Sequence, residues 1–297
     1  NCTDNTLEVA KNAGAKIIEC KQKVKSKGEV LKYTFNKLKS NDEIDAYVIF
    51  DADNVVHREF LNKMNASINC GYEVVQGFRD TKNICDNWLS TSYAILYYIQ
   101  SLFINKSRFN FGMSSFLNGT GFMVKKETID RYGYDPKTIT EDIEYTAICA
   151  INGIKIAFNE NAITYDEQVT DFKSSLKQRK RWSFGAIQCL KNYTGSLIKE
   201  GIKNKRFECF DVIIFYFGII FHVLFTIVSL IGIFYNVFYL NNFNSMDVVI
   251  YFIMFLINYF IGVVFRMIVI KKCNKSIKET IWGILLFDLF VLSWFPI

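Results

Sequence analysis

Residues 212–235 restrict the architecture of this chain more than any other stretch. They read VIIFYFGIIFHVLFTIVSLIGIFY, and these 24 residues contain no Asp, Glu, Lys or Arg. A helix of about 20 consecutive apolar residues crosses the hydrocarbon core of a bilayer. The run therefore predicts a membrane-spanning helix, and a purely water-soluble globular fold is not expected.

Two further apolar segments are predicted to follow, at about 248–270 and 281–297. The third contains Asp288, and because an acid at mid-membrane is costly we expect this segment to be interfacial or to face a polar cavity. Residues 1–195 scatter charges throughout and predict a soluble domain, joined to the apolar part by a basic juxtamembrane linker at 196–211. The chain opens as if a strand had just ended, so we expect a fragment whose N-terminal strand is missing.

Basic residues flank the apolar segments unevenly. Five Lys or Arg lie from Lys191 to Phe207 and five more from Arg266 to Glu279, whereas the loop 236–247 has none. Positive charge is retained on the cytoplasmic side of membranes. We therefore predict a multi-pass protein of the cell membrane with its large N-terminal domain in the cytoplasm, a membrane partner and no nucleic acid partner.

Strand-like and helix-like segments alternate along the N-terminal domain. Strands are predicted at 16–19, 45–50, 73–78, 117–124 and 154–158, with helical segments between them. This alternation predicts an α/β fold with a mostly parallel, Rossmann-like sheet. Ligands of such sheets bind outside the carboxyl ends of the strands.

Two aspartates follow one predicted buried strand. The stretch YVIFDADN, residues 47–54, leads apolar residues into Asp51 and Asp53. At strand spacing both side chains share a face, and their oxygens suit Mg²⁺ or Mn²⁺ with phosphate completing the coordination. A solvated turn explains this short motif equally well.

The stretch ITEDIEY places Thr140, Glu141 and Asp142 at a predicted helix start. A structural interpretation is available, because Thr caps helices and acids in the first turn complement the helix dipole. The functional interpretation makes one of the acids a general base at the mouth of a site.

The stretch LKQRKRWSFGA also admits two interpretations. It fits a basic amphipathic helix lying against anionic lipid. Alternatively, Arg181 neutralises a phosphate and Trp182 stacks on a sugar face. Lys27 precedes a glycine at a helix start, where it is either a diphosphate contact or a solvated lysine.

Together these motifs resemble the family 2 glycosyltransferases with a GT-A fold, which include cellulose, hyaluronan and poly-N-acetylglucosamine synthases. They stand here as Asp51-Ala52-Asp53, Thr140-Glu141-Asp142 and Gln178-Arg179-Lys180-Arg181-Trp182, separated by 86 and 35 residues. The resemblance covers about residues 1–190 and implies a GT-A domain followed by transmembrane helices. Asn54 departs from the pattern, because family members often have His there.

The resemblance implies a role for each motif residue. Asp51 and Asp53 would hold the donor diphosphate through Mg²⁺ or Mn²⁺, with Lys27 and Arg181 as further donor contacts. Asp142 would be the base that takes the acceptor proton. The acceptor side would include Asn118, Gly119, Glu141 and Trp182, and the remaining motif residues are Thr140, Gln178 and Arg179.

The expected function is inverting transfer of a sugar from a nucleotide-sugar, with a UDP-sugar as the expected donor, to a hydroxyl of a glycan or lipid-linked acceptor at the cytosolic membrane face. Processive synthesis and single transfer both fit the sequence. One alternative is a phosphotransferase or phosphatase with Asp51 as nucleophile. Another is a non-catalytic membrane scaffold that retains the fold.

Overall fold

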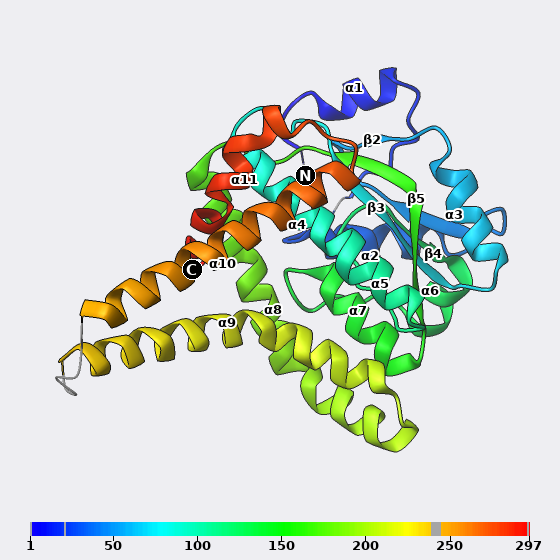
Figure 1. Ribbon diagram of the computed structural model, residues 1–297. Helices are drawn as coiled ribbons and strands as arrows, with labels where there is room; N and C mark the ends of the chain where they lie inside the picture. Colours follow the sequence, from blue (N-terminus) through cyan, green and yellow to red (C-terminus); the bar gives the residue numbers. More distant parts are fainter. Residues whose placement is uncertain (1, 21, 239–244, 296) are drawn as a thin grey trace.

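A five-stranded sheet forms the centre of the N-terminal domain (Figure 1). The computed structural model describes residues 2–20, 22–238, 245–295 and 297, with the backbone alone at some positions between 219 and 248. The strands are β1 (Ala46–Ile49), β2 (Val55–Val56), β3 (Val74–Thr81), β4 (Phe122–Lys125) and β5 (Ile156–Asp166). Their order across the sheet is β1-β4-β3-β5-β2.

The sheet is mixed, so the prediction of a mostly parallel sheet is wrong for the described strands. Among them β3 and β5 pair in parallel, whereas β4 is antiparallel to both β1 and β3, and β2 is antiparallel to β5. Gly119 and Gly121 have positive φ and precede β4, which runs back between its neighbours. Since β1, β3 and β5 still point the same way, their carboxyl ends meet at one edge.

Helices cover both faces of the sheet. The described helices of the domain are α1 (Thr6–Asn12), α2 (Lys27–Leu38), α3 (Phe60–Asn69), α4 (Trp88–Ile99), the π-helical η1 (Gln100–Asn105), α5 (Lys106–Asn110), α6 (Lys126–Tyr132) and α7 (Glu141–Asn152). On one face Phe60 and Met64 of α3 pack against Val75, and on the other α2, α6 and α7 form a second core. Every residue of β3 is buried, as expected for a strand covered on both sides.

The predicted strand at 16–19 is not formed. These residues lie in coil and are mostly exposed, and no described strand pairs with them. An isolated extended segment has no ladder partner for its backbone groups, so local propensity alone does not make it a strand.

The helix α8 (Phe172–Asn204) is an uninterrupted helix of 33 residues. It begins at Asp171, whose side chain accepts a hydrogen bond from the Ser174 N–H at 2.7 Å. It runs through position 195, where the sequence predicts the soluble domain to end, and the division into domain and linker remains a prediction. Gly185 brings α8 against the start of α7, because a Cβ there would lie 2.2 Å from Thr140 Oγ1.

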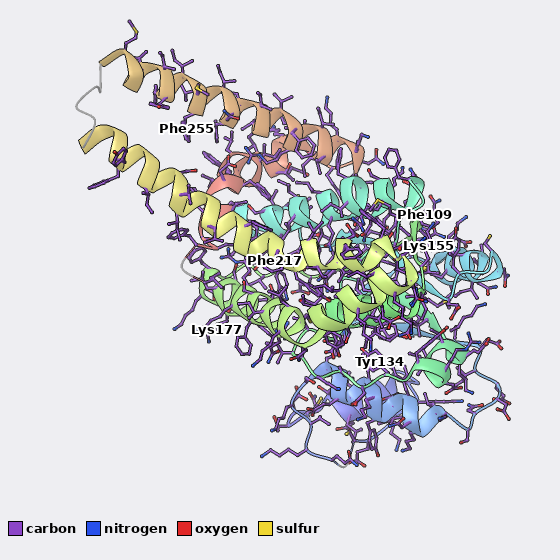
Figure 2. The ribbon with its side chains drawn as sticks, turned by 90° about the horizontal axis from the view of Figure 1, so that it is seen from below. Phe109, Tyr134, Lys155, Lys177, Phe217 and Phe255 are labelled. Atoms are coloured by element: carbon purple, nitrogen blue, oxygen red, sulfur yellow. The ribbon has the colours of Figure 1, made fainter. Side chains whose placement is uncertain are left out.

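Three helices follow α8, namely α9 (Phe207–Phe238), α10 (Ser245–Lys272) and α11 (Ile277–Leu292). In both views α9 and α10 project beyond the body of the molecule, with Phe255 on the projecting part of α10 (Figures 1 and 2). Within the described residues one stretch, Val249–Lys272, is long and apolar enough to span a membrane. The predicted span at 212–235 includes side chains outside the described residues, so a multi-helix membrane part remains a prediction.

The helix α11 packs along α4 and does not project. A Cβ on Gly283 would lie 2.2 Å from Thr91 Cβ, so the two backbones approach closely at this point. Asp288 forms an ion pair with Arg266 of α10 at 2.8 Å. The acid that makes the third apolar segment unusual therefore has a cationic partner.

We predict that Gly185→Ala destabilises the protein by about 1–3 kcal/mol, the usual range for overpacking. The added methyl group must displace Thr140 or move α8 away from α7. The matched control is Gly195→Ala in the same helix, where a Cβ meets nothing within 4 Å. A Gly-to-Ala change in an open helix position is expected to stabilise by roughly 0.5–1 kcal/mol. Thermal unfolding of both variants checks this, and an equal response would contradict the proposed close packing.

Candidate active site

The predicted site residues of the DAD and TED motifs lie where several elements converge at the carboxyl edge of the sheet. Asp51 lies two residues after the end of β1, and Asp166 ends β5. Thr140, Glu141 and Asp142 lie at the start of α7, with Thr140 at the N-cap position. The structure therefore brings the DAD and TED motifs, 86 residues apart in the chain, to one place.

Lys27 joins these two motifs. It is the first residue of α2, and Ser26 caps this helix by accepting a hydrogen bond from the Glu29 N–H. The Lys27 ammonium group forms an ion pair with Asp51, donates to the Gly119 carbonyl at 2.7 Å and lies 4.0 Å from a Glu141 oxygen. The predicted donor-binding lysine thus contacts both motifs, and about one-third of its side chain is exposed.

Gly119 separates Lys27 from Asp142. Its φ of +84° is unfavourable for other residues, and a Cβ here would lie 3.1 Å from Asp142 Oδ2. The absence of a side chain lets the Asp142 carboxylate lie directly against the backbone of the 118–120 loop. The structure therefore brings this loop next to Asp142, while its role in binding an acceptor remains a prediction.

Gly28 allows α2 to pack closely against the start of α7. A Cβ at this position would lie 2.6 Å from Pro136 Cγ and 3.0 Å from Glu141 Cβ. The side chain of Thr140 makes no capping hydrogen bond to α7, and its buried Oγ1 has no partner among the described residues. The interpretation of Thr140 as a side-chain cap is therefore wrong, because the residue instead fills the contact with Gly185.

Burial and crowding of carboxylates raise the pKa values of three acids in the site. Burial is the main cause for Glu141, where the neighbouring Asp142 adds to it and the pKa rises from 4.5 to about 7. Burial also raises the pKa of Asp142, against opposing contributions that include Lys27 and Arg79. The pKa of Asp53 is raised by burial and then by the negative charges of Asp166 and Asp51. Of these three acids, Glu141 therefore exchanges its proton near neutral pH, and perturbed pKa values of this kind are common at functional sites.

Arg79 and Asp166 are site residues that the sequence analysis did not single out. Buried Arg79 of β3 donates from Nε to Asp166 Oδ2 at 2.8 Å and from Nη1 to the Asn118 carbonyl at 2.9 Å. Asn54 donates to Asp166 Oδ1 at 2.8 Å. Arg79 directly follows the predicted strand 73–78, but Asp166 lies eight residues beyond the predicted strand 154–158, because β5 extends from Ile156 to Asp166. The pairing of the two side chains also depends on the order of strands in the sheet.

The residues of the QRKRW stretch point in different directions. Trp182 packs near Tyr93 and Tyr97 of α4, with ring centroids 6.0 and 6.4 Å away. Arg179 is fully buried and donates to the Phe290 carbonyl at 3.1 Å and to Ser293 Oγ at 2.7 Å. Gln178 places Oε1 in a buried position without a partner in the described chain.

Arg181 is exposed and lies apart from this packing. It lines a cavity of about 320 Å³ with Ile139, Lys180, Ser183, Phe184, Ile187 and Ile297. Ile139 immediately precedes the TED motif, so Arg181 faces the approach to α7. No contact described in the structure joins Arg181 to Asp51, Asp53 or Asp142, and its role at the diphosphate remains a prediction.

Asn118 presents an unpaired amide next to Gly119. Its side chain is buried, and neither Oδ1 nor Nδ2 has a hydrogen-bond partner among the described residues. Its backbone is held at both ends, because its N–H donates to Gln76 Oε1 at 3.1 Å and its carbonyl accepts from Arg79. Unpaired buried amide atoms are costly unless a ligand supplies partners.

The donor set at the DAD motif fits a divalent ion that shares its coordination with a substrate. Within the described residues no group of three or more His, Cys, Asp or Glu side chains is arranged to hold a metal ion. Asp51 and Asp53 supply carboxylate oxygens, which Mg²⁺ and Mn²⁺ prefer. Burial raises the pKa of Asp53, and the negative charges of Asp166 and Asp51 raise it further, so a dication bound here would reduce the repulsion among these carboxylates.

Comparison with known proteins agrees with this geometry. The family model described as "Glycosyltransferase like family 2" matches residues 1–185. The "Probable glycosyltransferase YdaM" of Bacillus subtilis (strain 168) is 24% identical over 199 residues, which cover 59% of this chain and 44% of that protein. The chain thus spans less than half the length of this curated relative.

We predict that Glu141→Gln alters the pH dependence of stability. Glu141 has a pKa of about 7 when folded against 4.5 ordinarily, so the unfolded chain releases a proton in this window that the folded protein retains. Wild-type stability therefore falls as pH rises from about 4.5 to about 7, by at most about 3 kcal/mol from this group.

The glutamine variant lacks this loss, so its stability relative to wild type should be greater at pH 8 than at pH 5. Denaturant unfolding at the two pH values measures the difference. Glu8→Gln on α1 removes one exposed carboxylate and controls for the change in net charge. A difference between Glu141→Gln and wild type that does not vary with pH would refute the prediction.

Proposed function

The chain belongs to glycosyltransferase family 2, and we propose that it transfers a sugar, with inversion, from a nucleotide-sugar to a hydroxyl of a glycan or lipid-linked acceptor. A UDP-sugar is the donor we expect. The observation that carries the proposal is the convergence of Lys27, Asp51 and Asp142 around Gly119. It places groups suited to a diphosphate next to a carboxylate suited to accept a proton.

In this proposal Asp142 is the general base. The acceptor oxygen attacks the anomeric carbon while its proton passes to the Asp142 carboxylate. The bond between the anomeric carbon and the diphosphate oxygen breaks, and its electron pair leaves with the diphosphate. A carboxylate whose pKa is raised by burial is a stronger base than a solvated one, which favours this role.

The donor end of the site is proposed to lie at Lys27, Asp51 and Asp53. Lys27 is about one-third exposed and pairs with Asp51, so a diphosphate is able to share its charge. Asp51 and Asp53 would hold Mg²⁺ or Mn²⁺, which when bound would neutralise charge on the departing diphosphate. Arg181 is proposed to contribute when the donor is bound.

The acceptor end is proposed to lie between the 118–120 loop and the aromatic side chains of α4 and α8. Trp182 packs edge-on to Tyr97, an arrangement that presents apolar ring surface. The unpaired amide of Asn118 supplies one acceptor and two donors for hydroxyl groups. Glu141 borders this region beside Lys27.

The two alternatives from the sequence receive less support. A phosphotransferase using Asp51 leaves the positions of Asp142 and Gly119 unexplained, and the family match runs from residue 1 into the first half of α8, to residue 185. A non-catalytic scaffold is opposed by the close fit of Lys27 to two motifs. The enzyme is a glycosyltransferase, consistent with its family and its curated relative.

The membrane location is likewise a proposal. Large apolar side chains are exposed along α10, namely Tyr251, Phe252, Phe255, Phe260, Ile261 and Val264. A contiguous exposed apolar surface of this kind suits lipid. We propose a multi-pass protein whose catalytic domain faces the cytoplasm, with α10 as one span and the 212–235 segment as another.

We predict that Asp142→Asn abolishes transfer and leaves donor binding largely intact, because the carboxamide keeps the shape but does not accept a proton. Full-length wild-type protein with Mn²⁺ or Mg²⁺ should release nucleoside diphosphate from at least one member of a panel of UDP- and GDP-sugars. The variant's turnover should fall by a factor on the order of 10² to 10⁴.

The two measurements test different parts of the proposal. No release by the wild type from any donor would reject the glycosyl-transfer assignment of this site. Loss of donor binding in Asp142→Asn, measured by titration calorimetry, would reject Asp142 as the base. Product analysis by mass spectrometry identifies the sugar that is moved.

We predict opposite labelling of two cysteines by a membrane-impermeant maleimide. Cys70 is exposed on the catalytic domain and should react in inside-out vesicles. A cysteine introduced by Asn241→Cys, in the loop that lacks Lys and Arg, should react in right-side-out vesicles. Peptide mapping separates the two sites, and labelling of both from the same side would refute the proposed orientation.

A further inference from the structure

Arg79 occupies a buried position between the acids of the site. Its Nε and Nη2 donate to Asp166 Oδ2, and Nη1 donates to the Asn118 carbonyl. The guanidinium group also lies over the ring of Tyr97, 3.8 Å from its centroid. The planar fork of an arginine thus meets an acid, a backbone carbonyl and an aromatic face at once.

Asp166 extends the contact from Arg79 to the DAD motif. Its Oδ2 accepts from Arg79 and from Gln168 Nε2 at 3.1 Å, while Oδ1 accepts from Asn54 Nδ2 at 2.8 Å. Both carboxylate oxygens therefore accept hydrogen bonds from side chains of the protein. The described contacts of Asp166 connect two parts of the site.

Asn54 completes the connection. Its Oδ1 accepts from the Asp51 N–H at 3.2 Å and from the Thr120 hydroxyl. The amide side chain therefore fixes the turn after β1 and the loop before β4 to the same carboxylate. This gives a structural account of Asn54, the position at which the chain departs from the family pattern.

The network joins segments that carry the two sides of the proposed reaction. Arg79 holds Asn118, next to the Gly119 that lies against Asp142. Through Asp166 and Asn54 it also holds the backbone of Asp51. Arg79 is one of the positive charges that oppose the burial-driven rise in the pKa of Asp142.

We infer that Arg79 is a positioning residue for the transfer step, which sets the 118–120 loop and the DAD turn at a fixed distance and supplies buried positive charge between their acids. This inference rests on the proposed function and deepens it. If the Arg79–Asp166 pair is purely structural, replacing both residues with neutral partners leaves no unpaired buried charge and restores both stability and turnover. If Arg79 is a positioning cation, the same replacement does not restore turnover, because neutral partners do not balance the charges of Asp51 and Asp142.

The test compares Arg79→Gln with the double variant Arg79→Gln/Asp166→Asn in the full-length protein. The double variant removes both charges and replaces the ion pair with two amides. We expect it to recover the thermal midpoint lost in Arg79→Gln while turnover remains depressed on the order of 10²-fold, the scale typical of misplaced reacting groups. Arg79→Lys keeps the charge but loses the fork, and its turnover should lie between those of wild type and Arg79→Gln.

The matched control is Arg108→Gln, since Arg108 pairs with Asp211, donates to the Ser114 carbonyl at 2.9 Å and stacks on Phe116. We expect a comparable loss of stability with a smaller loss of turnover. Recovery of turnover together with stability in the double variant would overturn the inference. So would an equal loss of turnover in Arg108→Gln, or wild-type turnover in Arg79→Gln.

Hydrogen exchange separates failure of this inference from failure of the proposed function. Without any substrate, Arg79→Gln should speed exchange of the backbone amides at 117–121 and 51–54, while Arg108→Gln leaves those at 51–54 unchanged. If the wild type transfers no sugar, the proposed function fails and exchange alone decides the role of Arg79. Unchanged exchange in Arg79→Gln would overturn that role.

Discussion

Repulsion between carboxylates is the constraint under which this site is assembled. The acids gathered here are Asp51, Asp53, Glu141, Asp142 and Asp166. Like charges at such proximity disfavour ionisation and strain the fold unless cations lie among them. Lys27 lies on the solvent side and pairs with Asp51, while Arg79 lies in the interior and pairs with Asp166. The two cations therefore differ in accessibility. Lys27 is partly exposed and accessible to a ligand, whereas Arg79 is buried and its contacts are with the protein.

Close packing at three glycines also fixes the start of α7. The start of α7 is surrounded by Gly28 of α2, Gly119 of the loop before β4 and Gly185 of α8, and a side chain at any of the three would collide with Glu141, Asp142 or Thr140. Removing side chains at these points lets three backbones approach one helix end. The position of the Asp142 carboxylate is therefore fixed by elements packed at short range, as the proposed role of Asp142 as general base requires.

The C-terminal helices are built into the same assembly. Arg179 of α8 donates to the carbonyl of Phe290 and to Ser293 at the end of α11, and Trp182 lies 6.3 Å from Trp294. The QRKRW segment thus joins the catalytic domain to the apolar part of the chain through its buried face. Its exposed face, with Lys180 and Arg181, stays open toward the approach to α7. This helix therefore has one face packed on the end of α11 and another face that exposes basic side chains.

Residue type and short spacing by themselves determined the α/β character, the apolar C-terminal helices and the DAD, TED and QRKRW motifs, because these depend on local periodicity and on neighbours in the chain. Local sequence preferences also predicted a helix start at Thr140 and another at Lys27, which precedes a glycine. Tertiary structure alone decided that β4 runs antiparallel between β1 and β3, that residues 16–19 do not form a strand, and that Arg79 meets Asp166. These outcomes depend on which segments become neighbours across the sheet. Such neighbours lie tens of residues apart in the chain, and local sequence patterns do not predict which of them pair.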